Sequence, residues 1–320
     1  MDKLYSNATI RRIKEEHNFR LSKSLGQNFL TDGNIVAKIV DSCEATEEDL
    51  VIEIGPGIGV LTAEAAEQAG KVVAVEIDKN LIPILKETLA DYPNVTVVNQ
   101  DILKTDVVKL IEEHGQIDGK APKGVKVIGN LPYYITTPII MKLLEDHIPC
   151  DSITIMMQKE VAERIEAGPG SKTYGALSVA VQYYCEVCYV TTVPKEVFHP
   201  RPKVDSAVLR LDLRKEKPVE LIDEELFFEV IKGGFGQRRK TLHNALTGVR
   251  GLAKDRVAEV LAEAGIEANR RAETLSIEEF ARIANIIARG AKGLRVVSTA
   301  IKESTPIRSL TTAKVAERIC

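Results

Sequence analysis

Residues 50–59 constrain the fold of this chain more than any other stretch. They begin with a short apolar run, interrupted only by Glu53, which indicates a buried parallel strand. A helical pattern follows over residues 60–66, and between strand and helix lie three glycines at alternate positions. The glycines are Gly55, Gly57 and Gly59. A strand, a glycine turn and a helix open the nucleotide crevice of doubly wound α/β domains, where a ligand lies against bare backbone.

The glycine turn is not specific by itself. Its Gly-x-Gly-x-Gly spacing differs from the Gly-x-Gly-x-x-Gly fingerprint of dinucleotide-binding domains, and it also suits a purely structural turn. The next two predicted strands, 71–78 and 95–98, narrow the choice of ligand, because each ends in or runs into acidic residues. An acid at the tip of the second strand accepts hydrogen bonds from ribose hydroxyls and repels a 2′-phosphate. Asp101, after the third strand, can accept from an adenine amino group. The pattern therefore predicts an unphosphorylated adenosine as ligand.

The fourth predicted strand, 125–129, ends in the tetrapeptide Asn130-Leu131-Pro132-Tyr133. Such a segment after a fourth strand resembles the motif of amino methyltransferases that act on exocyclic nitrogens of bases, where the nitrogen lone pair is delocalised into the ring. Two acceptors, the Asn130 side-chain oxygen and the Leu131 carbonyl, can hold both N–H groups and free the lone pair. Pro132 stiffens the loop, and the ring of Tyr133 can stack on a base. An ordinary proline turn is the structural alternative.

Length and composition indicate a two-domain globular protein. The chain has 320 residues, of which 44% are hydrophobic and 28% charged. No apolar run approaches the ~20 residues of a membrane span, and residues 1–4 lack the apolar region of a signal peptide. We therefore expect a cytoplasmic protein without membrane contact. Five cysteines form no regular framework, and Cys185-x-x-Cys188 lacks a second pair, so we expect no metal site.

Charge is distributed unevenly along the chain. The net charge is −3, yet residues 1–25 carry six cations against three acids, and residues 232–256 carry seven cations against one acid. One basic segment is commonly just a solvated surface, whereas two of them around a base-modifying site favour a bound polyanion. Within the second segment, Arg238, Arg239 and Lys240 fall at the start of a predicted helix. Cations there oppose the helix dipole unless phosphates compensate them.

The remaining pattern predicts the domain organisation. A capped helix at 6–18 and a loop at 24–31 precede alternating strands and helices from 50 to 158, which require a parallel sheet. Two more strands flank a proline-rich loop that holds Phe198, either as a second stacking wall for a base or as a core residue. We therefore expect an α/β domain at 1–214 with a doubly wound, mostly parallel, Rossmann-like sheet. A small all-helical domain at 215–290 and a mobile tail at 291–320 complete the prediction.

Five motifs, taken together and in order, resemble one family. They are Leu25–Leu30, Glu53–Gly59, Asn99–Ile102, Asn130–Tyr133, and the pair Phe198–Ser206 with Phe235–Lys240. Over roughly residues 5–288 the chain resembles the KsgA-type ribosomal RNA adenine N6,N6-dimethyltransferases. The resemblance implies S-adenosylmethionine as cofactor. It also implies dimethylation of two adjacent adenosines near the 3′ end of small-subunit (16S) rRNA, within an assembling ribosomal particle during ribosome maturation. We expect a monomer, since no heptad pattern occurs.

The resemblance also implies roles for individual residues. Loop 24–31 would close over the methionine part of the cofactor, Glu76 would bind the ribose and Asp101 the adenine. The cofactor-binding residues would be Gln27, Asn28, Leu30, Gly55, Gly57, Glu76, Ile77, Asp101, Ile102 and Asn130. The catalytic residues would be Asn130, Leu131, Tyr133 and Phe198. The RNA-binding residues would be Arg201, Lys203, Arg238, Arg239 and Lys240, with the helical domain docking on the ribosome.

Three alternatives remain at this stage. A macrolide-resistance methyltransferase shares the core motifs but modifies large-subunit rRNA; the basic segment 236–240 and the loop 198–206 favour the small-subunit enzymes. A ribosome-assembly or transcription factor could keep the fold without catalysis, although intact Glu76, Asp101 and Asn130 argue against it. A nicotinamide-dependent dehydrogenase is disfavoured by the glycine spacing and by the tetrapeptide after the fourth strand.

Overall fold

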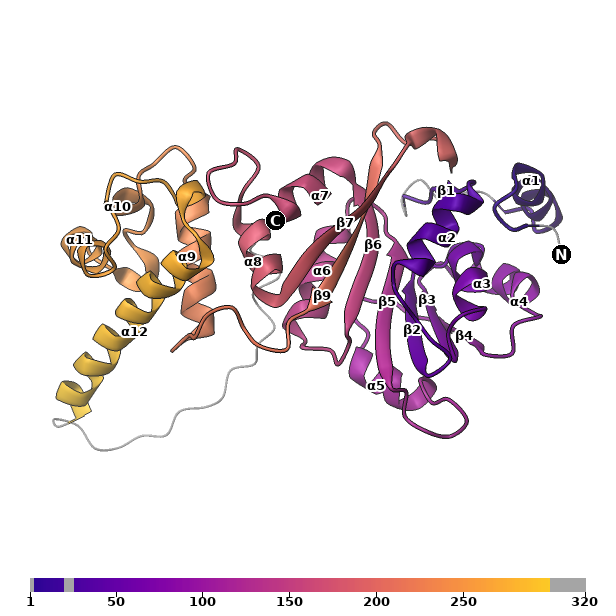
Figure 1. Cartoon of the computed structure of the whole chain (residues 1–320), viewed down its shortest axis with the longest axis horizontal. Helices are drawn as coiled ribbons and strands as arrows, with labels where there is room; N and C mark the ends of the chain where they lie inside the picture. Colours follow the sequence, from indigo (N-terminus) through magenta and orange to yellow (C-terminus); the bar gives the residue numbers. More distant parts are fainter. Residues whose placement is uncertain (1–2, 20–25, 300–320) are drawn as a thin grey trace. The chain divides into compact units, whose positions relative to one another are not determined.

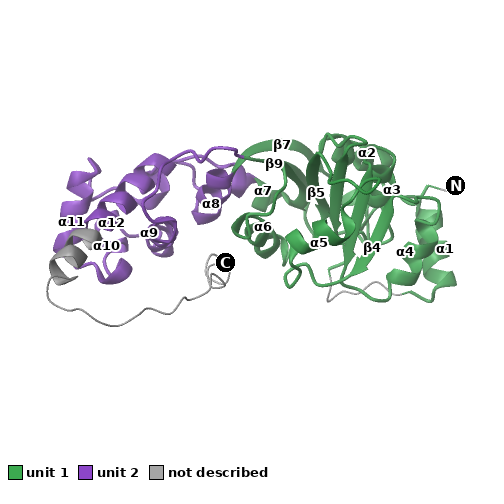
Figure 2. Ribbon diagram, turned by 90° about the horizontal axis from the view of Figure 1, so that it is seen from below, with its two compact units in different colours: residues 1–162, 185–213 green, residues 163–184, 214–320 purple. Residues whose placement is uncertain are grey.

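The computed structural model describes residues 3–19 and 26–299 of the chain. The chain divides into two compact units, residues 1–162 with 185–213 and residues 163–184 with 214–320 (Figure 2). The predicted domains differ from these units in one respect. Residues 163–184, expected in the first domain, belong to the second unit. The reason is aromatic packing: on α8 (Ala176–Tyr184) the rings of Tyr183 and Tyr184 lie 5.2–5.8 Å from those of Phe227 and Phe228 on α9 (Glu224–Gly236).

A seven-stranded sheet forms the first unit, in the order β4-β3-β2-β5-β6-β9-β7 (Figure 1). The strands are β2 (Asp49–Ile54), β3 (Lys71–Glu76), β4 (Val95–Asn99), β5 (Gly124–Asn130), β6 (Ser152–Gln158), β7 (Cys185–Val193) and β9 (Ser206–Leu213). Strands β2 to β6 pair in parallel, and β9 is antiparallel to both β6 and β7. This confirms the doubly wound, mostly parallel prediction. The strand order reverses between β2 and β5, which opens a crevice at the carboxyl ends of the strands.

Helices cover the sheet as its right-handed crossovers require. They are α1 (Asn7–Glu16), α2 (Gly33–Asp41), α3 (Val60–Ala66), α4 (Ile82–Thr88), α5 (Val107–His114), α6 (Thr136–Glu145) and α7 (Lys159–Glu166). Ser6 caps α1 by accepting from the Thr9 N–H, as predicted, and Asp32 caps α2. Ile39, Leu61 and Ile84, from α2, α3 and α4, pack in one apolar cluster with strand residues. Each fully buried side chain of this size stabilises the fold by about 1.5–3 kcal/mol.

A small two-stranded sheet was not foreseen from the sequence. β1 (Phe29–Leu30) pairs antiparallel with β8 (Phe198–His199), which follows the short 3₁₀ turn η1 (Lys195–Val197). The pairing opposes Leu30 to Phe198 and buries both, with Phe198 only 5% exposed inside the apolar cluster. Of the two positions considered for Phe198, the structure shows the core position and not a wall open to a base.

The described part of the second unit is helical throughout. Besides α8 and α9 it contains α10 (Leu242–Ala245), α11 (Lys254–Glu263), α12 (Ile277–Thr299), and the 3₁₀ turns η2 (Val249–Gly251) and η3 (Ala272–Thr274). Helix α12 continues past the predicted domain boundary at residue 290, without a break, to Thr299. The rest of the predicted tail, 300–320, lies outside the described residues. Over residues 3–19 and 26–299, the helices are too short or too polar to span a bilayer.

The cations Arg238, Arg239 and Lys240 do not lie at a helix start. Helix α9 extends to Gly236 with Gln237 as its C-cap, so the three cations follow the carboxyl end of α9, and α10 begins only after Thr241. The carboxyl end of a helix dipole is negative and favours nearby cations. The electrostatic conflict expected from the sequence is therefore absent, because the sequence pattern ended α9 too early.

Candidate active site

A cavity lies in the first unit at the carboxyl ends of the central strands. Its walls come from residues 26–30, from the β2–α3 turn, from the ends of β3 and β4, and from residues 130–135 after β5. All ten residues predicted to bind a cofactor line it, namely Gln27, Asn28, Leu30, Gly55, Gly57, Glu76, Ile77, Asp101, Ile102 and Asn130. Leu131 and Tyr133 line it as well. Phe198, Arg201 and Lys203 are not among the lining residues.

The glycine turn presents bare backbone to this cavity. Gly55, Gly57 and Gly59 have φ of 69°, 62° and 89°, values that L-residues with side chains adopt at a cost. A Cβ built on Gly55 meets no atom within 4 Å, so the peptide there faces open space. A Cβ on Gly57 would lie 3.0 Å from Cε1 of Phe29. The turn thus requires glycine both for conformation and for room.

Glu76 ends β3 with its carboxylate held by backbone. Its Oε1 accepts from the Asp78 N–H at 2.8 Å and its Oε2 from the Gly57 N–H at 3.2 Å, and the residue is 4% exposed. Burial raises the pKa of Glu76, while the two N–H groups favour its ionised form. Each oxygen keeps a lone pair for another donor. The carboxylate is therefore fixed in a position to accept hydrogen bonds from two hydroxyl groups.

Glu53 is a second buried acid on the cavity, which in the sequence interrupts an apolar strand and begins the motif Glu53–Gly59 without a predicted role of its own. It is 1% exposed, and its Oε2 accepts from Oγ1 of Thr62 at 2.5 Å. Burial raises the pKa of Glu53 to about 8, and the charge of Glu76 acts in the same direction. At neutral pH this carboxyl group is therefore mostly protonated. The sequence signal that could have indicated this buried acid was a single acidic residue inside an otherwise apolar strand.

One acid and two apolar side chains line the cavity beyond the ends of β3 and β4. Oδ1 of Asp101 accepts from the Leu103 N–H at 3.0 Å, and Lys104 lies 3.7 Å from its other oxygen. Ile77 is 50% exposed although it lines the cavity, whereas Ile102 is buried. An acceptor beside two aliphatic side chains suits a flat heterocycle that carries an amino group.

Asn130 is oriented by the loop that crosses the cavity. Its Nδ2 donates to the Asn28 carbonyl at 2.9 Å, which leaves Oδ1 as the acceptor end of the amide. Asn28 is itself held, since its Nδ2 donates to the Gly26 carbonyl at 3.0 Å. Within the described ranges the Leu131 carbonyl receives no hydrogen bond, whereas the Pro132 carbonyl accepts two. The two acceptors expected from the sequence, at positions 130 and 131, are both available.

Tyr133 is tied to a distant strand. Its hydroxyl lies 2.8 Å from Oγ of Ser206, a fully buried residue at the start of β9. Burial raises the pKa of Tyr133, and the nearby charge of Asp205 adds to this. The ring is half-buried, and the hydrogen bond holds its hydroxyl end. Ser206 belonged to a recognised motif, but nothing in the sequence indicated that it contacts Tyr133.

Loop 26–30 is held at both sides of the cavity. Nε2 of Gln27 donates to Oδ2 of Asp78 at 2.9 Å, just beyond the end of β3. On the other side, the Asn28 carbonyl accepts a hydrogen bond from the Asn130 side-chain amide. The pairing of β1 with β8 anchors the end of the loop. Residues 26–30 therefore form a fixed wall of the cavity, and their closing over a cofactor stays a prediction.

The predicted RNA-binding cations lie outside the cavity. Arg201 forms an ion pair with Glu196, and Lys203 is exposed. Arg238 donates to the Lys172 carbonyl at 2.9 Å. Arg239 and Lys240 are exposed, and among residues 26–299 their side chains form no ion pair or hydrogen bond.

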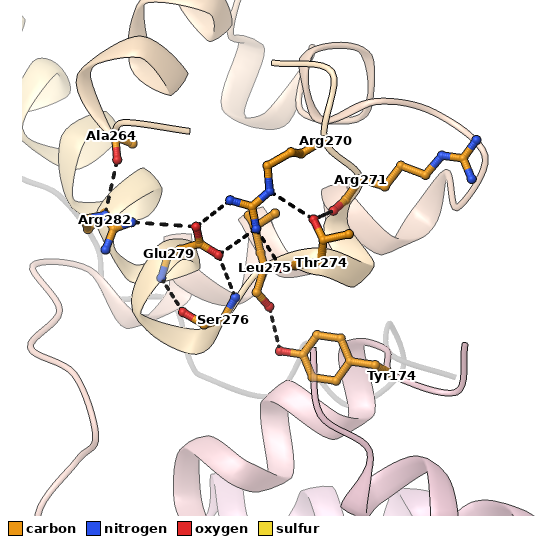
Figure 3. A network of polar contacts seen from close by, with 9 residues as sticks. All are labelled: Tyr174, Ala264, Arg270, Arg271, Thr274, Leu275, Ser276, Glu279 and Arg282. Atoms are coloured by element: carbon orange, nitrogen blue, oxygen red, sulfur yellow. Dashed lines mark hydrogen bonds and ion pairs between the residues drawn. The ribbon is translucent and has the colours of Figure 1, made fainter. Parts of the chain in front are cut away.

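A polar network in the second unit supports the segment next to these cations (Figure 3). Arg270 holds the Glu279 carboxylate with two hydrogen bonds of 2.6 and 3.0 Å, which lowers the pKa of Glu279. The Arg270 carbonyl accepts from the Leu242 N–H at 2.7 Å and so fixes α10, which follows the basic segment. Arg271 extends away from the network and is exposed (Figure 3). No sequence pattern indicated Arg271 as a further surface cation.

Metal chemistry finds no support in the described residues. They hold no group of three or more His, Cys, Asp or Glu side chains that could bind a metal ion. Of the Cys185-x-x-Cys188 pair, Cys185 is buried as expected, whereas Cys188 is exposed. Their opposite exposure follows from β7, on which this part of the strand alternates between covered and open positions.

Comparison with known proteins identifies similar sequences and structures. The family model for ribosomal RNA adenine dimethylases matches residues 18–289. The chain is 55% identical to ribosomal RNA small subunit methyltransferase A of Alkaliphilus oremlandii, over 90% of this chain and 99% of that protein. The corresponding protein of Clostridioides difficile is 52% identical, over 90% and 98%.

Two solved structures are also similar. A dimethyladenosine transferase from Plasmodium falciparum superposes with a TM-score of 0.68 at 26% identity, covering 82% of this chain and 98% of that one. The 23S rRNA methyltransferase ErmE superposes with a TM-score of 0.61 at 28% identity, covering 80% and 98%. Both similarities extend over most of the present chain.

Proposed function

This chain belongs to the ribosomal RNA adenine dimethylase family, and we propose that it dimethylates N6 of two adjacent adenosines near the 3′ end of small-subunit rRNA during ribosome maturation. The observation that carries the proposal is the Asn130 amide, whose oxygen is turned to accept beside the unoccupied Leu131 carbonyl in the described structure. The relatives that share more than half of their residues with this chain are named small subunit methyltransferases.

The cavity fits S-adenosylmethionine, which supplies an electrophilic methyl group. Gly55 offers bare backbone where the amino-acid part of such a molecule would lie. Glu76 offers two fixed oxygens to ribose hydroxyls, and Asp101 offers an acceptor to the adenine amino group. Ile77 and Ile102 supply apolar contact for the adenine ring.

Asn130 and Leu131 activate the target amine by accepting hydrogen bonds from it. Their two oxygens hold the N–H groups of the target amine, which favours a tetrahedral nitrogen with its lone pair directed to the methyl group. Positioning and fixed dipoles supply the rate enhancement. No side chain has to act as a base, because the nitrogen becomes acidic once it is methylated. His199 is exposed and needs no catalytic role.

Tyr133 provides the stacking surface for the target base. The adenosine has to leave its stack, which costs a few kcal/mol and less in a single-stranded or looped RNA. Contact with the half-buried ring offsets part of this cost. The hydrogen bond to Ser206 holds the ring in one orientation while the base enters.

RNA docking is assigned to the second unit. Arg238, Arg239 and Lys240 are exposed and consecutive, and Arg271 adds a cation near the same support network. Such a group suits phosphates of an assembling small ribosomal subunit. We expect the enzyme to act there as a monomer.

The test is methyl incorporation from labelled S-adenosylmethionine into unmethylated small and large ribosomal subunits, with the modified site mapped by reverse-transcriptase stops. Stops at two adjacent adenosines near the small-subunit rRNA 3′ end are the expected result. Label in the large subunit alone would instead assign the chain to the activity named for ErmE, with which it shares its fold. Absence of label from both subunits, despite cofactor binding, would indicate an assembly factor without catalysis.

A further inference from the structure

Tyr134 stands out at the rim of the cavity. It lines the cavity next to Tyr133, yet it is 61% exposed. Among the large apolar side chains exposed in the described part of the chain, which are Ile77, Val108, Tyr134, Val204 and Ile222, it is the single aromatic one. Leaving an aromatic ring in water forgoes a large burial energy, so its location at the mouth calls for an occupant.

The two neighbouring tyrosines differ in how they are held. The Tyr133 hydroxyl is bonded to Ser206, whereas the Tyr134 hydroxyl has no partner within residues 3–19 and 26–299. Tyr134 is supported from one side, where a Cβ on Gly26 would lie 3.5 and 3.6 Å from its ring atoms Cε1 and Cδ1. The ring is therefore backed by the loop across the cavity and open to solvent elsewhere.

We propose that Tyr134 is a stacking platform for the nucleotide next to the target adenosine. This inference rests on the proposed function, because an RNA strand that delivers one base to Asn130 continues past the cavity mouth. The base undergoing methylation needs a site that excludes water, and a ring that is more than half exposed cannot supply it. An adjoining base has no such requirement, and it can stack on an aromatic ring irrespective of its identity.

An exposed cation outside the cavity, in the loop before β9, suits a nucleic-acid occupant. Lys203 is exposed and lies three residues before Ser206, which contacts Tyr133. A cation in this loop can meet the phosphate of a nucleotide that stacks on Tyr134. For an enzyme that modifies two neighbouring adenosines, such a platform would hold one of them while the other occupies the pocket.

The experiment compares Tyr134→Ala with Tyr134→Phe. A synthetic RNA strand with two adjacent adenosines carries 2-aminopurine on one or the other side of them, and its fluorescence is quenched when it stacks on an aromatic ring. We expect Tyr134→Ala to abolish the quenching on one side and to raise KM for unmethylated small subunits by about 5- to 150-fold. Tyr134→Phe, which keeps the ring, should retain both. Val108→Ala, an exposed apolar residue on α5 away from the cavity, is the matched control.

Two outcomes would overturn the inference. Unchanged quenching and unchanged KM in Tyr134→Ala would show that no nucleotide stacks there. A parallel loss of S-adenosylhomocysteine affinity, measured by calorimetry without RNA, would show that Tyr134 instead supports loop 26–30. Failure of the proposed function is distinct from both, since the wild-type protein itself would then leave small subunits unmethylated.

Discussion

The acidic residues of the cavity and the cations of the basic segment are arranged in opposite ways. Glu53 and Glu76 are almost fully buried and accept hydrogen bonds from fixed donors, whereas Arg239 and Lys240 are exposed and unpaired within the described residues. Buried, fixed dipoles act strongly and directionally, because little water screens them. Exposed cations act over distance and are screened by salt. The difference separates the part of the chain suited to chemistry from the part suited to docking.

Asn130→Ala should have the largest effect, because it removes one of the two fixed acceptors. We expect methylation of small subunits to fall by roughly 10²–10³-fold, the range for loss of one fixed hydrogen-bonding group. Cofactor affinity, measured by calorimetry, should stay within a few-fold of wild type, since the variant retains Glu76 and Gly55, the residues proposed to hold the cofactor. Equal loss of both properties would contradict the role of Asn130 and indicate a collapsed loop 26–30.

Glu53→Gln should change the pH dependence of stability. The pKa of Glu53 in the folded chain is about 8, above its ordinary value, so between those pH values the native state holds a proton that the unfolded state has lost. The free energy of unfolding therefore falls as pH rises through this window, by at most about 1.4 kcal/mol per pH unit. Glutamine mimics the protonated acid and removes this slope.

Urea unfolding of both proteins at pH 6, 7, 8 and 9 measures the effect of Glu53. The variant should gain stability relative to wild type up to about pH 8 and then hold a constant advantage. Thr62 can still donate to the amide oxygen, so the packing contact is kept. If the free energies of unfolding of wild type and variant changed with pH in the same way, Glu53 would be ionised in the folded protein at neutral pH.

Changing Arg238, Arg239 and Lys240 together to Glu should weaken RNA binding about 10- to 100-fold near physiological salt. The slope of log affinity against log salt should fall by about 1 for each phosphate that is no longer neutralised. Methyl transfer at saturating RNA should be preserved, because no cavity residue changes. Glu replacement of Lys86, Lys109 and Lys120, which are exposed in the first unit and lie outside both basic segments, gives a charge-matched control. An unchanged salt slope would exclude the basic segment from RNA docking.

Ser206→Ala should have the smallest effect, since it frees the Tyr133 ring without removing it. We expect a loss of about 2- to 10-fold in kcat/KM, consistent with one net hydrogen bond. Tyr133→Phe removes the same bond from the other side, so the double variant should lose no more than either single one. Additive losses would mean that Ser206 and Tyr133 act independently.

Much of the cavity could be predicted from the sequence because its residues follow strand ends. In a parallel sheet the carboxyl ends of neighbouring strands share one edge, so Gly55, Glu76, Asp101 and Asn130 had to converge once the strands were identified. The local patterns that define those strands are strong. Whether each residue contacts a cofactor remains a prediction.

Other features depend on contacts between distant segments, which local patterns do not encode. The burial of Phe198 requires β8 to pair with β1, and the orientation of Tyr133 requires Ser206. The position of Arg238 depends on how far α9 continues past Gly233 and Gly234, two residues of low helix propensity. In the structure Gly234 is buried and α9 passes straight through.

The loop across the cavity has a consequence for how many methyl groups are added per encounter. Loop 26–30 is bonded to Asp78 at one side and orients Asn130 at the other, so any opening that exchanges a spent cofactor also releases the Asn130 amide. The acceptor geometry would then have to re-form before each transfer. A singly methylated adenosine would be free to depart at that moment, which makes distributive rather than processive methylation the behaviour that this connection favours.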